Sequence, residues 1–138
     1  MLIKKHKDEN PGRVIIPTNH PNHPEPHEVD VAFILARHYR CTVEFLVPVD
    51  DYMRKTADLK MLGVTWEVKS PTGNSKSTIG AQFRRASRQS NNIVLDTRRT
   101  KLNYDKIKKQ IIIETKQRTS INKVILINKS GKVVEIKI

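Results

Sequence analysis

The chain has 138 residues and a formal net charge of +12, with 26 Lys and Arg against 14 Asp and Glu. The excess lies in one half: residues 1–69 hold ten basic and ten acidic side chains, whereas residues 70–138 hold 16 and four. A single cysteine excludes a disulfide framework, no apolar run approaches the ~20 residues of a membrane span, and the N-terminus lacks the apolar region of a signal peptide. We therefore expect one cytoplasmic domain, residues 1–138, whose partner is nucleic acid and not a membrane.

The first half predicts an irregular segment, a helix and three strands. Val14–Ile16 could form a short strand, but prolines interrupt residues 1–27 and forbid a continuous element there. An apolar block over 28–39 predicts a buried helix, and the β-branched run 42–47 predicts a strand that Pro48 ends. Residues 57–61 and 64–69 alternate in polarity around Gly63, the pattern of a hairpin.

The second half predicts a helix, a strand, a further helix and a hairpin. Ile79, Phe83 and Ala86 form the apolar stripe of the first helix. A buried strand follows at 92–97, and Tyr104 begins the spacing of a helix that ends near residue 116. Runs 123–128 and 133–138 predict a terminal hairpin. The order of elements predicts an α/β fold with a mixed central sheet flanked by helices, a core over 28–97, and an added basic helix and hairpin over 98–138.

The hairpin places two acids together. If Leu62 and Gly63 close it, Asp58 lies opposite Glu67, with Cβ atoms about 5 Å apart. Like charges so placed are destabilising unless they share a proton or bind a cation. Lys69 follows on the same face, although a one-residue slip would move Asp58 to the other face. Two carboxylates that hold Mg²⁺ or Mn²⁺, beside a lysine that orients or deprotonates a water, suit phosphodiester hydrolysis.

The residues Asp58 and Glu67-Val68-Lys69 resemble the motif of the PD-(D/E)XK nuclease superfamily, whose core runs helix, three strands, helix, strand. The resemblance implies catalytic Asp58, Glu67 and Lys69, a divalent metal held by Asp58, Glu67 and the Val68 carbonyl, and a further metal-binding acid on the first helix. Glu28 matches that acid, because its neighbours along the helix are apolar.

The tract 66–96 also resembles the C-terminal tRNase domains of bacterial contact-dependent growth inhibition toxins. That resemblance implies cleavage of RNA, in particular tRNA. A further interpretation, compatible with a nuclease, is a toxin that is bound by an acidic immunity protein and acts in the cytosol of a target cell after delivery. A homodimer is compatible with the sequence.

A second, basic cluster favours phosphate contacts. Lys76 and Thr78 open a helix whose N-terminal N–H groups favour an anion, and Gln82 lies near its packed side. Exposed arginines of this helix and of the next strand end are expected to follow a nucleic-acid backbone: Arg84, Arg85, Arg88, Arg98 and Arg99. The chain holds few aromatic residues, so base stacking as in RNA-recognition sheets has little support.

The preferred hypothesis is a metal-dependent endonuclease that prefers RNA to DNA. One alternative is a DNA endonuclease of the same fold. Another is a non-catalytic basic nucleic-acid-binding module. In that module the acids Asp58 and Glu67 only form cross-strand ion pairs with Lys60 and Lys69. His20, His23 and His27 have metal-like spacing, but a proline-rich loop is a poor zinc cage.

Overall fold

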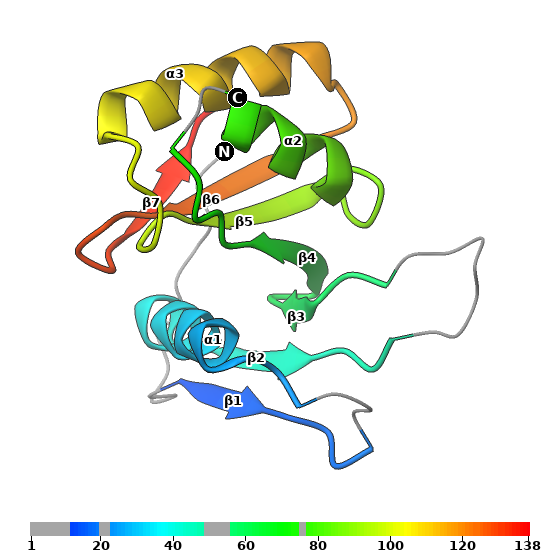
Figure 1. Cartoon of the computed structure of the whole chain (residues 1–138). Helices are drawn as coiled ribbons and strands as arrows, with labels where there is room; N and C mark the ends of the chain where they lie inside the picture. The colour runs from blue at the N-terminus through cyan, green and yellow to red at the C-terminus, as the bar shows by residue number, and fades with distance from the viewer. Residues whose placement is uncertain (1–11, 20–22, 49–55, 75–76) are drawn as a thin grey trace.

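The computed structural model describes residues 12–19, 23–48, 56–74 and 77–138. These residues form three helices and one seven-stranded sheet whose strand order follows the chain (Figure 1). In chain order the elements are β1 (Arg13–Ile15), α1 (Pro26–Tyr39), β2 (Thr42–Phe45), β3 (Leu59–Met61), β4 (Val64–Lys69), α2 (Ser77–Ala86), β5 (Asn92–Asp96), α3 (Tyr104–Gln117), β6 (Lys123–Ile127) and β7 (Val133–Ile136).

The sheet is mixed, as predicted. β1 is parallel to β2, and β4, β5 and β6 are parallel to one another. The pairs β2–β3, β3–β4 and β6–β7 are antiparallel. The expected order of helix, three strands, helix and strand is confirmed by α1, β2, β3, β4, α2 and β5. None of the described helices is both long and apolar enough to cross a membrane.

Helices cover both faces of the sheet (Figure 1). The sheet has one hydrophobic core on each face, and alternate residues of β5 point into different cores. Val94 packs in the core that contains α1, whereas Ile93 and Leu95 pack with α2 and α3. In β4, Trp66 belongs to the α1 core. Because side chains alternate along a strand and Glu67 is the Cα partner of Ile93, Glu67 lies on the face that α2 and α3 cover.

Local signals at the helix ends account for the differences from the predicted bounds. α1 begins two residues before the expected Glu28, because Pro26 is favourable in a first helical turn and Glu25 forms a capping box with Glu28. Arg40 ends it in the left-handed conformation. At α3, the Asn103 side chain accepts a hydrogen bond from the Lys106 amide. The helix starts there because Asn103 satisfies an N–H that would otherwise lack a partner.

Candidate catalytic site

The site lies where β4 changes partners. Along the described chain, β3 pairs with Val64–Trp66 and β5 pairs with Glu67–Lys69. The turn between β3 and β4 has positive φ at Leu62 (53°) and Gly63 (78°), as a type I′ turn requires. The predicted register is confirmed for Met61–Val64 and Leu59–Trp66. The last three residues of β4 therefore pair with β5 along one edge. Their other edge faces the residues just before β3, including Asp58.

Asp58 lies at that edge, but not at the position that the regular strand register predicts. Its N–H donates to the Trp66 carbonyl at 3.1 Å, so Asp58 and Leu59 both lie opposite Trp66, as at a β-bulge. Its Oδ2 accepts a hydrogen bond from the Val68 N–H at 2.9 Å. The carboxylate is thus directed onto β4 at Val68, beside Glu67, rather than continuing the ladder directly opposite Glu67.

Glu67 is a buried acid in an unfavourable electrostatic environment. It is 2% exposed, and its Oε2 lies 3.1 Å from Lys69 Nζ. Its Oε1 has no hydrogen-bond partner among the described residues. Burial, followed by the negative charge of Asp58, raises the pKa of Glu67 to about 8, although Lys69 acts in the opposite direction.

These features fit a divalent cation. A buried carboxylate oxygen without a partner, next to a second carboxylate, is the donor set that a hard cation prefers. The Val68 carbonyl is directed to the same edge, because the N–H and C=O of one strand residue point the same way and its N–H reaches Asp58. The Asp58 carboxylate therefore lies beside Glu67 and the Val68 backbone.

Glu28 reaches this region from the other face. It lines a cavity of about 200 Å³ together with Asp58 and His23. Its side chain accepts a hydrogen bond from the Glu25 amide as part of the capping box. Within the described ranges, no three His, Cys, Asp or Glu side chains are grouped closely enough to hold a metal ion. Glu28 thus shares a cavity with Asp58 without closing a three-carboxylate site.

The helix α2 carries the predicted basic side chains on the face of the sheet that contains Glu67. Ile79, Phe83 and Ala86 are buried against the sheet and α3, and Gln82 is half-buried beside them. The arginines of the helix and of the turn after it are exposed: Arg84, Arg85 and Arg88.

The start of α2 is only partly described. Thr78 is half-buried against Gly73, where an added Cβ would lie 2.6 Å from Thr78 Oγ1. Lys76 lies outside the described residues, as does His20 among the histidines.

Arg98 differs from the prediction, because its guanidinium is occupied by protein groups. Its Nε and Nη2 each donate to Asp96 at 2.9 Å, Nη2 also donates to the His27 carbonyl at 3.0 Å, and Nη1 lies 3.7 Å from Asp30. These contacts raise the pKa of Arg98, mainly through its hydrogen bonds to Asp96. Arg98 therefore joins the start of α1 to the end of β5 instead of following a nucleic-acid backbone. Arg99 is exposed and donates to the Ser70 carbonyl at 3.1 Å.

Asp96 is a buried partner of Arg98 that the sequence did not predict. Asp96 is fully buried and also accepts a hydrogen bond from the Ser70 hydroxyl. The available signal was an acid at the end of an apolar strand, two residues before Arg98.

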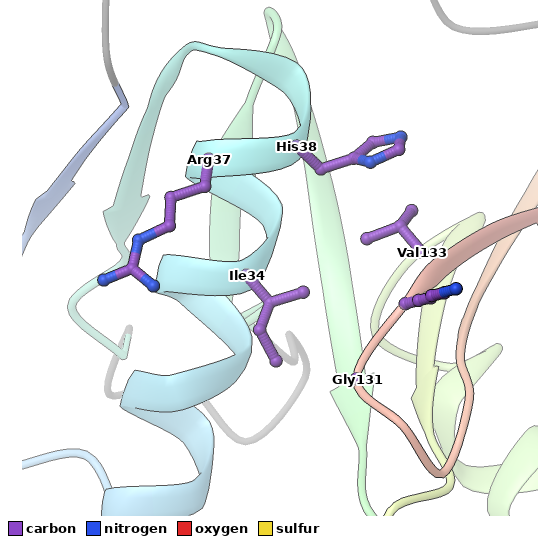
Figure 2. Close-up of a pocket in the computed structure, with 6 residues that line it drawn as sticks. Ile34, Arg37, His38, Gly131 and Val133 are labelled. Atoms are coloured by element: carbon purple, nitrogen blue, oxygen red, sulfur yellow. The ribbon is translucent and has the colours of Figure 1, made fainter.

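A second cavity, of about 450 Å³, lies between α1 and the β6–β7 turn. Figure 2 shows Ile34 and Val133 pointing toward each other across it, while Arg37 points away. Its lining includes His38 and Lys132 but no carboxylate. Among the described residues, this cavity therefore has no pair of acids like Asp58 and Glu67.

Comparisons with known proteins found a matching family model and a solved structure of the same fold. The family model "Contact-dependent growth inhibition CdiA C-terminal domain" matches residues 55–133, which are 79 of the 138 residues. A chain in the solved "CdiA-CT/CdiI toxin and immunity complex from Burkholderia pseudomallei" is 21% identical, with a TM-score of 0.69 over 92% of this chain and 100% of that chain. That likeness shows a shared fold. No curated protein sequence matches the chain. Because the family model matches more than half of the sequence, the chain belongs to the contact-dependent growth inhibition CdiA C-terminal domain family.

Proposed function

We propose that this toxin domain is a metal-dependent endoribonuclease of the PD-(D/E)XK type. The observation that carries the proposal is the unpartnered Oε1 of buried Glu67 beside Asp58, with Lys69 Nζ 3.1 Å from the other Glu67 oxygen. Two acids and one lysine brought together at the end of β4 match the needs of phosphodiester hydrolysis. Membership of a toxin family supports a destructive activity of this kind.

Each site residue has a role set by its contacts. Asp58, Glu67 and the Val68 carbonyl would hold Mg²⁺ or Mn²⁺, and Glu28 would approach from the shared cavity. When bound, such an ion polarises the phosphoryl group and lowers the pKa of a coordinated water. Lys69 is 21% exposed. It can therefore orient the attacking water from the solvent side and stabilise the negative charge of the transition state.

The raised pKa of Glu67 sets the pH at which the site is ready. Near neutral pH a proton occupies Glu67 in part, since its pKa is raised to about 8 by burial and by Asp58. A cation must displace that proton, because only the ionised carboxylate binds a divalent ion. We therefore infer that activity rises with pH until Glu67 is fully ionised.

The proposed substrate is RNA, and more specifically tRNA. Arg84, Arg85 and Arg88 are exposed on and beside α2, which covers the face that contains Glu67. Exposed arginines near the reacting phosphate would bind the backbone without reading its sequence.

The experiment compares Glu67→Gln with Glu44→Gln on total tRNA, single-stranded RNA and duplex DNA, with Mg²⁺ or with EDTA. Glu44 is a half-buried acid on β2 and a Cα partner of Lys60, so it controls for loss of a strand carboxylate. We expect Glu67→Gln to lower RNA cleavage by at least about 100-fold, a loss of about 2.7 kcal/mol in transition-state stabilisation, and Glu44→Gln to retain it.

A Glu67→Gln protein as active as the parent would overturn the catalytic site. If the parent protein binds RNA but cleaves neither RNA nor DNA, the chain is the non-catalytic binding module instead. Cleavage of DNA alone would identify the DNA endonuclease of the same fold.

We further infer that an acidic immunity protein neutralises the domain and that the domain acts in the cytosol of a target cell. The related solved chain was obtained as a toxin and immunity complex, and a net charge of +12 favours an acidic partner. Binding of such a partner should abolish the RNA cleavage described above.

A further inference from the structure

A cavity of about 340 Å³ lies between the start of α3 and the β6–β7 turn, on the opposite side of that turn from the cavity in Figure 2. Its lining residues are Thr97, Tyr104, Ile107, Asn128, Lys129 and Ser130. The volume is in the range of small-ligand pockets, which is about 300–1,000 Å³. Neither the catalytic proposal nor the family description assigns a role to it.

The cavity opens on the same face of the sheet as the catalytic lysine. Lys69 is the Cα partner of Leu95 on β5, and Leu95 packs in one core with Ile107 of α3. Thr97 follows β5 by one residue and is fixed to β6 by hydrogen bonds from its N–H and hydroxyl to the Ile127 carbonyl. Neighbouring strands lie about 4.8 Å apart, so only two strand spacings, about 10 Å, separate β4 from β6.

A cationic side chain, Arg99, also lies on the chain segment between β5 and α3 and contacts the residue that follows Lys69. Arg99 Nη2 donates to the carbonyl of Ser70, the residue after Lys69. Lys101 is exposed on the same loop, which then enters α3 at Tyr104. A nucleic-acid strand that leaves the catalytic site in this direction therefore meets positive charge before it reaches the cavity.

Tyr104 makes the cavity suitable for a nucleobase. It is an aromatic residue in the first helical position and is 41% exposed. Lys108 Nζ lies 5.7 Å from its ring centroid, and Lys129 is exposed at the other wall. Because Lys108 lies over one face of the ring, a base would stack on the opposite face while the two lysines bind the flanking phosphates, whichever base is present.

We propose that this cavity holds an unstacked nucleobase of single-stranded RNA on Tyr104, next to the site of cleavage. The inference rests on the proposed ribonuclease function and gives it a substrate preference for unpaired RNA, because a base in a duplex is not available to stack on a side chain.

The experiment measures binding, so that cleavage does not interfere. In a Glu67→Gln background, Tyr104→Ala and Tyr104→Phe are titrated with a single-stranded RNA that carries 2-aminopurine and with the same RNA as a duplex. Phe33→Ala is a matched control, since Phe33 is 42% exposed and has Arg37 over its ring at 5.7 Å, but lies on α1.

We expect Tyr104→Ala to weaken single-stranded RNA binding by about 5- to 150-fold, the range for one stacked base, and to abolish the quenching of 2-aminopurine. Tyr104→Phe should retain both, and Phe33→Ala should match the parent. Duplex binding should change less than twofold.

Unchanged single-stranded binding by Tyr104→Ala, or an equal loss for duplex, would overturn the inference and leave the cavity to a protein partner. Absence of RNA cleavage by the parent protein is a separate result that would reject the ribonuclease and not the binding of a base.

Discussion

At the scale of single residues, Glu67 lowers the stability of the folded state. A carboxylate that is 2% exposed and has one oxygen without a partner costs free energy in the folded state. Lys69 offsets part of this cost by its ion pair. The cost is therefore highest when Glu67 is ionised and no cation is bound.

This arrangement predicts an unusual pH dependence of stability. Glu67 ionises near 4.5 when unfolded, but burial and Asp58 raise its folded pKa to about 8. Between these values the unfolded chain binds fewer protons than the folded chain, so the free energy of unfolding falls as pH rises. Urea unfolding at pH 5 and pH 8.5 should show the parent losing a few kcal/mol relative to Glu67→Gln.

Mg²⁺ or Mn²⁺ should restore the lost stability of the parent at pH 8.5 and leave Glu67→Gln unchanged, because a ligand stabilises only the state that binds it. Parallel pH profiles for the two proteins would show that Glu67 does not carry this proton.

The sequence predicted that Glu67 and Lys69 share one face of a strand but not how Asp58 is held beside them. Alternation around Gly63 was sufficient to place Glu67 and Lys69 on one face. The position of Asp58 depends on a bulge, in which its N–H and carboxylate bond to different residues of β4. Such a shift arises from tertiary hydrogen bonds, which a period-two pattern cannot contain.

At the scale of elements, Arg98 fixes α1 to the sheet. Its guanidinium contacts Asp96 at the end of β5, Asp30 on α1 and the His27 carbonyl. The sequence predicted α1 and β5 correctly but assigned Arg98 to nucleic acid, because a basic side chain after a strand resembles a surface charge until its buried partner is known. Asp96 is that partner, and it is fully buried.

The consequence is tested with Arg98→Met and its neighbour Arg99→Met. Loss of the Arg98 guanidinium leaves the buried Asp96 carboxylate without its main counter-charge, so we expect a loss of about 3 kcal/mol in the free energy of unfolding. Arg99 is exposed and makes one hydrogen bond to a carbonyl, so its loss should cost less than about 1 kcal/mol. Equal effects in denaturant unfolding would contradict the assigned role of Asp96.

At the scale of the whole molecule, the two halves of the sequence differ both in net charge and in the elements that they contribute. The described acids of the site lie in the half of the sequence with no net charge, and α2, α3 and the second hairpin belong to the half with +12. Composition could predict this division because it needs only counting. It could not predict that α2 and α3 lie on one face and α1 on the other, which depends on the packing of β5 between the two cores.

The division predicts which arginines determine the salt dependence of RNA binding. In a Glu67→Gln background, replacing Arg84, Arg85 and Arg88 by Gln should reduce the slope of log K against log salt by about 2, since each phosphate contact with a single strand contributes about 0.7. Replacing Arg13, Arg37 and Arg40, which are exposed on β1 and at the end of α1, is the matched control and should leave the slope unchanged. The opposite ranking would place the RNA on the α1 face.

The hydrogen bond from the Val68 N–H to Asp58 does not depend on which side chain stands at position 68. Asp58 is anchored by a main-chain group that every amino acid except proline supplies. The side chain at position 68 is therefore not needed for this contact, and Val68 packs against the α1 core with it. In the proposed nuclease site, position 68 would contribute its backbone, whereas Asp58 and Glu67 would contribute their side chains.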